Sequence, residues 1–149
     1  MKYRLLTFGV AVISALWSCQ LAHPVSAAIA EREPNDERSQ LLGNLGLNQS
    51  LEVMGGFTTN DVLDHYKIEV MDNQLLRVRL KSNARLTARI FQDRDGSGTV
   101  SQADPFIGMI QVGQSLKTQN SGSYIIRVLK PAAMSPALST YHLSLQAER

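Results

Sequence analysis

Apolar and polar residues alternate with a period of two along most of the chain beyond residue 60. Tyr66, Ile68 and Val70 alternate with Lys67 and Glu69. Similar alternation recurs at residues 76–80, 86–90, 124–128 and 141–145. Successive side chains of a strand point to opposite faces, so this pattern is typical of strands with one buried and one solvated face.

Turn-forming residues punctuate the alternating runs. They are Gly55-Gly56, Asp72-Asn73, Ser82-Asn83, Asp95 to Gly98, Asn120 to Gly122 and Pro131 to Pro136. Residues 106–112 read as one more strand, and residues 38–47 have room for one short helical turn at most. Several short strands separated by such turns predict an all-β domain, an antiparallel β-sandwich.

The N-terminus has the layout of a secretory signal peptide. Lys2 and Arg4 precede an almost wholly apolar stretch from Leu5 to Trp17, and small residues at 25–27 form a cleavage site. We therefore expect residues 1–27 to be a leader, with the product periplasmic or secreted. The alternative is a lipoprotein, because residues 16–19 have the outline of a lipobox that would anchor the chain to a membrane through Cys19.

Removal of the leader balances the charge of the chain. Of 15 basic residues, Lys2 and Arg4 leave with the leader, and the number that remains equals the 13 acidic residues. A neutral product has no general attraction for nucleic acid or anionic membranes. Cys19 is the only cysteine, so no disulfide is available and a bound metal becomes the next stabilising device to consider.

Four segments, in this order, resemble the bacterial pre-peptidase C-terminal domain. They are Glu33 to Asp36, Asp61 to Val70, Gly122 to Val128 and Tyr141 to Leu145. The resemblance implies a jelly-roll-like β-sandwich of the kind that accompanies secreted proteases and includes the collagen-binding domains of clostridial collagenases. On this basis we expect an acidic N-terminal arm at residues 28–37 and a sandwich domain at residues 38–149.

The arm is rich in carboxylates and amides, which leaves two interpretations open. A charged chain terminus is often flexible, but calcium takes six to eight hard oxygen ligands and a short acidic segment provides several. The collagen-binding relatives hold a pair of calcium ions between such an arm and two aspartates of a later loop. By this resemblance the ligands here are Glu31, Glu33, Asn35, Asp36, Asp61 and Asp64.

A second candidate calcium site matches the EF-hand loop pattern. Its ligands would be Asp93, Asp95, Ser97, Thr99 and Asp104, with Gly98 at the sixth position. Asp104 is shorter than the usual glutamate, and strands rather than helices flank the loop, so we expect a weaker site. The alternative is a polar loop shaped by Asx turns and by glycines with positive φ.

The chain carries no recognisable catalytic motif. Gly-x-Ser-x-Gly, His-Glu-x-x-His and P-loop patterns are absent, and His65 and His142 have no nucleophile at a known spacing. Asp61 and Asp64 would make a glycosidase pair only with split pKa values, and two acids beside an acidic arm more often bind a cation. We therefore expect a protein that is not an enzyme.

Several basic residues occupy the outward positions of the predicted strands. They are Lys67, Arg77, Arg79, Arg89 and Arg127. If their strands are neighbours, they form either an ordinary solvated face or a docking surface for an anionic polysaccharide or an acidic protein. Tyr66, Tyr124 and Tyr141 fall on inward positions, so the aromatic ligand surface of the collagen-binding relatives is not expected here.

These features predict an exported, non-catalytic, calcium-stabilised binding or accessory module. Its partner would be a cell-envelope polysaccharide or a secreted protein. The alternative is a chaperone-like or inhibitory subunit of an exported peptidase, because domains of this family are usually found next to peptidases.

Overall fold

The structure, a computed structural model, describes residues 26–131 and 138–149. Most of the predicted leader, with Cys19, and most of the proline-bounded turn at 131–136 lie outside the described residues. Within the described ranges the chain forms ten strands. No helix there is long and apolar enough to cross a membrane.

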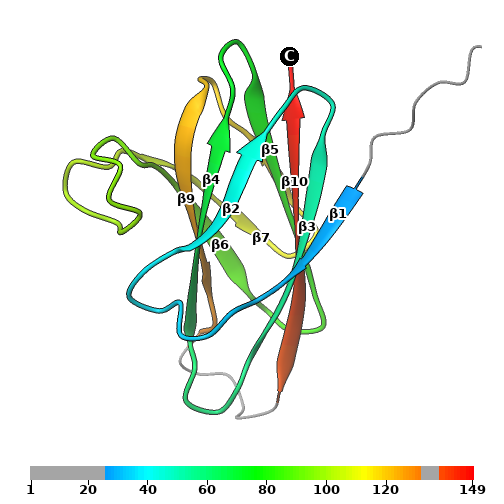
Figure 1. The fold of residues 1–149 in the computed structure, drawn as a ribbon. Helices are drawn as coiled ribbons and strands as arrows, with labels where there is room; N and C mark the ends of the chain where they lie inside the picture. The colour runs from blue at the N-terminus through cyan, green and yellow to red at the C-terminus, as the bar shows by residue number, and fades with distance from the viewer. Residues whose placement is uncertain (1–25, 132–137) are drawn as a thin grey trace, which may run out of the picture.

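The strands form two sheets that face each other (Figure 1). In spatial order, sheet A contains β1 (Ser26–Ala30), β3 (Ser50–Phe57), β10 (Ser139–Glu148), β5 (Leu75–Ser82) and β8 (Ser115–Lys117). Sheet B contains β2 (Gln40–Leu45), β4 (Leu63–Val70), β9 (Gly122–Leu129), β6 (Thr87–Gln92) and β7 (Phe106–Gln111). The predicted all-β, jelly-roll-like sandwich is confirmed.

The N-terminal strands depart from the antiparallel pairing of the rest. β1 pairs with β3 and β2 pairs with β4 in parallel, whereas the other pairings are antiparallel. Parallel neighbours need a crossover connection, and here each is joined through a strand of the opposite sheet. β1 begins at Ser26, so this strand runs through the predicted cleavage position after Ala27.

The core lies between the sheets and is built from the inward members of the alternating runs. The large side chains buried there include Tyr66, Tyr124, Tyr141, Phe57, Ile68, Leu80, Ile90, Ile126 and Leu143. The inward orientation expected for the three tyrosines is confirmed. Their burial removes apolar surface from water and provides the main driving force for folding.

One local expectation is wrong, and one segment forms a strand that the sequence pattern did not predict. Residues 38–47 form no helical turn, because Gln40 and Leu41 pair with β4 as the edge of sheet B. Gly55-Gly56 is not a turn but lies within β3, opposite Tyr141 and Thr140 of β10. A side chain at Gly55 would collide with the ring of Tyr141, so the glycine provides space for a tyrosine rather than a change of chain direction.

Candidate metal centre

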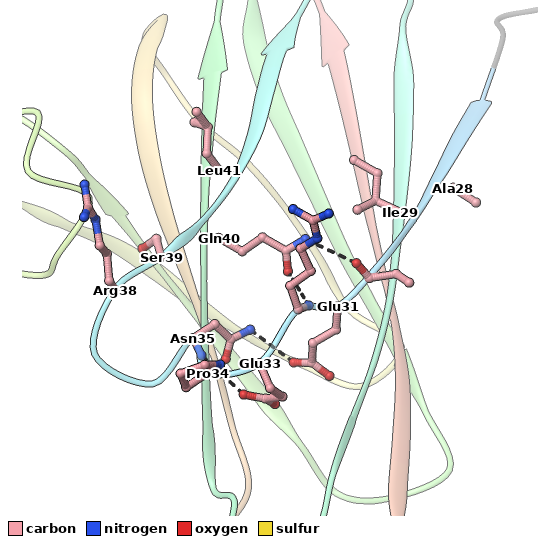
Figure 2. Close-up of a pocket in the computed structure, with 12 residues that line it drawn as sticks. Ala28, Ile29, Glu31, Glu33, Pro34, Asn35, Arg38, Ser39, Gln40 and Leu41 are labelled. Carbon is pink, nitrogen blue, oxygen red and sulfur yellow. Dashed lines mark hydrogen bonds between the residues drawn. The ribbon is translucent and has the colours of Figure 1, made fainter.

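The acidic arm crosses from sheet A to sheet B (Figures 1 and 2), and it is hydrogen-bonded to both sheets. The Glu31 amide donates to the Met54 carbonyl of β3 at 3.0 Å, and the Asn35 carbonyl accepts from the His65 amide of β4 at 3.3 Å. The arm also borders an open hollow of about 920 Å³ between β1 and β2. It is therefore a structured connection between the two sheets.

Glu31 is the most heavily bonded acid of the arm. Its Oε2 accepts from the Gly56 amide at 2.8 Å. Its Oε1 accepts from the hydroxyl of Tyr66 at 2.9 Å, from the hydroxyl of Tyr141 at 3.2 Å and from Nδ2 of Asn35 at 3.2 Å. These donors hold the carboxylate over the end of the core, beside the β4 strand that carries Asp64.

Asp64 joins two groups of carboxylates. One consists of Glu31, Glu33 and Asp64, and the other of Asp36, Asp61 and Asp64. Within each group the three residues offer one oxygen apiece, and these oxygens lie within 4.8 Å of one another. The structure thus brings together the five carboxylates predicted for the first site, with Asn35 bonded to Glu31.

Two oxygens of this cluster are buried without a hydrogen-bond partner. They are Oδ1 of Asp64 and Oδ1 of Asn35, and both residues are almost fully buried. Buried polar atoms are nearly always bonded, so two such acceptors in one acidic cluster need an explanation. A cation that shares both groups would provide one, since calcium binds carboxylate and amide oxygens.

The electrostatics of the cluster favour a positive charge. Burial and the neighbouring Glu31 raise the pKa of Asp64 to about 9, so without a cation this carboxyl keeps its proton at neutral pH. Burial and the charges of Glu31, Asp61 and Asp36 also raise the pKa of Glu33. Burial opposes ionisation of Glu31 as well, but its hydrogen bonds to Asp64 and Gly56 lower its pKa overall.

Tyr66 and Tyr141 belong to this site, and sequence reasoning placed them only in the core. Their hydroxyls bond to each other, and that of Tyr141 also donates to Oδ2 of Asp64 at 2.7 Å. Burial raises the pKa of both phenols, so they stay protonated and act as donors. The available signal was the inward position of both residues, with Tyr66 only two positions after Asp64 on β4.

The second predicted site lies in the loop after β6, which projects from the side of the sandwich (Figure 1). Oxygens of Asp93, Asp95 and Asp104 lie within 4.8 Å of one another. Local bonds also shape the loop: Oδ1 of Asp95 accepts from the Ser97 amide at 2.9 Å, and Gly96 and Gly98 have φ of 72° and 71°. The loop thus combines the acid cluster with the turn features of the alternative interpretation.

The five outward basic residues do not share one face. Arg77 and Arg79 lie on β5 in sheet A, whereas Lys67, Arg89 and Arg127 lie on sheet B, whose outer face points the opposite way. The prediction of a single basic face is therefore wrong. Alternation along a strand indicates whether a residue points inward or outward, but it does not indicate to which sheet the strand belongs.

Three of these five residues also have intramolecular partners. Lys67 contacts Asp93, Arg77 contacts Glu148, and Arg127 lies over the Phe91 ring at 5.7 Å and bonds to His65. Their positive charges therefore already interact with other groups of the same chain.

Neither a protein-family model nor a curated protein matches the sequence. Among solved structures, the chain is similar to PliG of Aeromonas hydrophila, a periplasmic lysozyme inhibitor of g-type lysozyme. The TM-score is 0.53 at 18% identity, over 74% of this chain and 99% of that one. It is also similar to the pre-peptidase C-terminal domain of Bacillus anthracis collagenase, with a TM-score of 0.51 at 16% identity, over 75% of this chain and 100% of that one. The chain therefore has the fold of the pre-peptidase C-terminal domain.

Proposed function

We propose that this chain is an exported, non-catalytic accessory module whose N-terminal arm is fixed to the sandwich by calcium. The observation that carries the proposal is the buried, unpartnered Oδ1 of Asp64, located where two groups of three carboxylates meet. Clustered carboxylates without a counter-charge destabilise a fold, and a cation between them reverses the sign of that interaction. Melting temperature in calcium and in chelator tests the role of the ion.

The ligand chemistry favours calcium over other metals. Each group consists of carboxylates, with an amide oxygen nearby and no histidine or cysteine. Hard oxygen ligands suit calcium, whereas zinc usually takes nitrogen or sulfur. The residues that would hold the ions are Glu31, Glu33, Asn35, Asp36, Asp61 and Asp64. The ions would neutralise these carboxylates and connect the arm to β4.

Two observations support an exported, periplasmic location. The first 27 residues have the layout of a signal peptide. The similar structure from Aeromonas hydrophila is described as periplasmic. In this proposal the module works where calcium is available at millimolar concentration and where extracellular calcium sites of modest affinity are filled.

The outer face of sheet B offers a surface for a protein partner. Phe106 and Met109 are 57% and 48% exposed, and the Phe106 ring lies 5.5 Å from that of Phe91. The exposed Arg89 pairs directly with Met109 across the sheet. Protein interfaces are enriched in aromatic residues, methionine and arginine, so this combination fits a protein better than a polysaccharide.

Inhibition of an exported hydrolase is the second candidate function. The observation that favours it is the likeness to PliG, which inhibits g-type lysozyme, over 99% of the length of that chain. An inhibitor needs no catalytic groups of its own, only a rigid surface that occupies the site of an enzyme. The calcium-fixed module and the inhibitor are compatible, since the ion stabilises the scaffold and the surface binds the target.

The mature chain is therefore expected to bind and inhibit a g-type lysozyme in a peptidoglycan hydrolysis assay, if the second function holds. Phe106→Ser should weaken that inhibition at least about tenfold, because an exposed aromatic anchor is removed from the surface. Leu138→Ser is the matched control, since Leu138 is 69% exposed but lies outside sheet B, just before β10.

Other outcomes separate the candidates. If Phe106→Ser leaves the inhibition intact, the outer face of sheet B is not the surface that binds the enzyme. Absence of inhibition, together with salt-sensitive retention on an anionic polysaccharide that Arg89→Gln abolishes, would replace the protein partner with a polymer.

A further inference from the structure

The loop at residues 93–104 contains a second buried carboxylate, that of Asp93. Asp93 is 5% exposed, and its Oδ1 has no hydrogen-bond partner. Its Oδ2 accepts from the Gly98 amide at 3.3 Å and from the Ser123 hydroxyl at 3.4 Å. One oxygen is thus used to shape the loop, while the other is left without a protein donor.

The other acids of the loop are held close to Asp93. Asp104 is buried, and its two oxygens accept from the Arg94 amide at 2.9 Å and from the Ser101 amide at 2.8 Å. Oδ2 of Asp95 accepts from the Ser101 hydroxyl at 3.0 Å. Asp93, Asp95 and Asp104 together offer three oxygens within 4.8 Å, so the unpartnered oxygen of Asp93 belongs to an acidic, oxygen-rich setting.

A positive charge from outside the loop already reaches this cluster. The ammonium of Lys67, on β4, lies 2.6 Å from Oδ2 of Asp93 and donates to the Gly96 carbonyl at 2.9 Å. The side chain of Lys67 is only 15% exposed and that of Asp93 is fully buried. This ion pair connects the loop to sheet B, and a hydrogen bond from the Ser39 amide to the Gly98 carbonyl at 3.2 Å connects it to the residue just before β2.

We propose that the loop binds a divalent cation through Asp93, Asp95 and Asp104 and that Lys67 sets the affinity of this site by competing for Asp93. Lys67 neutralises one oxygen of Asp93, and a cation on the other oxygen would be repelled by the nearby ammonium. The site then fills only where divalent cations are abundant, and in their absence Lys67 keeps the loop attached. Lys67 thus belongs to the metal site rather than to a docking face.

Calcium titration by calorimetry tests this site apart from the arm site. An Asp64→Asn background removes the carboxylate that the arm groups share. In that background the loop should still bind one calcium ion, and Asp95→Asn should weaken the binding at least about tenfold. Asp95 is exposed and lies outside the core, so this variant reports on the site without a change to the buried scaffold.

Lys67→Met in the same background is expected to strengthen calcium binding about tenfold, because a like charge beside the site is removed. Lys67→Arg should keep the affinity within a few fold of the parent, since the charge remains. Arg79→Met, which removes the same charge from the opposite sheet, is the control for net charge and should have no effect beyond about twofold.

Two results would overturn the proposal. One is the lack of a calcium-dependent heat in the Asp64→Asn background at millimolar calcium. The other is equal affinity in the Lys67→Met and Arg79→Met variants. Should Lys67→Met fail to fold, unchanged calcium binding after Asp95→Asn would by itself contradict the site.

Discussion

Chelation of calcium is expected to lower the melting temperature of the mature protein by about 10 °C. A ligand that binds only the folded form stabilises it by about 2.7 kcal/mol when its free concentration is about 100 times Kd. For a domain of this size each kcal/mol corresponds to about 3–4 °C. The source of the effect is the arm site, where the oxygens of Glu31, Glu33 and Asp64 lie within 4.8 Å of one another.

Asp64→Asn is expected to remove most of this calcium-dependent shift. The variant keeps the shape of the side chain and an acceptor for the Tyr141 hydroxyl, but it removes the charge that both carboxylate groups share. In chelator it should melt close to the wild type, because without a cation the raised pKa of Asp64 already leaves its carboxyl uncharged at neutral pH. Differential scanning calorimetry of both proteins, with and without calcium, measures all four values.

Asp72→Asn is the matched control for this experiment. Asp72 is an exposed acid in the turn between β4 and β5, and its loss changes the net charge by the same amount. It should leave the calcium shift intact. A shift that survives Asp64→Asn, or one that Asp72→Asn reduces equally, would mean that the ion does not bind at the arm.

Gly55→Ala is expected to destabilise the protein by about 3 kcal/mol, the upper end of the usual cost of overpacking. A Cβ at Gly55 would lie 2.5 Å from Cζ of Tyr141 and 2.9 Å from Oε2 of Glu31. Neither neighbour has room to retreat, because the Tyr141 ring packs against Phe57 in the core and Oε2 of Glu31 is bonded to the next amide, that of Gly56. Urea unfolding of the variant measures the loss.

The same substitution should also weaken calcium binding, because it displaces two residues of the arm site together. Gly46→Ala is the control, since a Cβ there meets only the end of the exposed Gln49 side chain, at 3.1 Å. Movement of that side chain would disturb at most the hydrogen bond that Oε1 of Gln49 accepts from the Gly46 amide at 2.8 Å. We expect that variant to cost less than about 1 kcal/mol. Equal losses of folding stability in the two variants would show that the close approach of Gly55 to Tyr141 makes no particular contribution to stability.

Much of the fold follows from local patterns. Alternation such as that of Tyr66, Ile68 and Val70 predicts β4 and the inward side of each residue. Predictions failed where a segment has no strong alternation. β2 has a weak apolar pattern and forms as an edge strand because β4 offers it free hydrogen-bonding groups. Gly55 suggested a turn because a glycine by itself does not reveal that a tyrosine from β10 fills its space.

The residues of the candidate sites also fall into two groups, those that local sequence predicted and those that only the fold revealed. The acids of the arm and of the loop were identified from composition and from motif order, since a ligand set is a property of residue types. The participation of Tyr66 and Tyr141, and the ion pair between Lys67 and Asp93, join strands that are distant in sequence or lie in different sheets. Pairing across strands determines these contacts, and no short stretch of the chain contains both partners.

Sequence alone was enough to specify the strongly alternating strands, their buried sides and the acidic residues, because periodicity and side-chain chemistry are local properties. Only the folded arrangement decided which outward charges share a face. Consecutive strands often cross to the opposite sheet, so Arg79 and Arg89, only ten positions apart, point away from each other. The folded arrangement also determined that Asp64 lies beside the arm, because the position of a buried carboxylate depends on which residues pack around it.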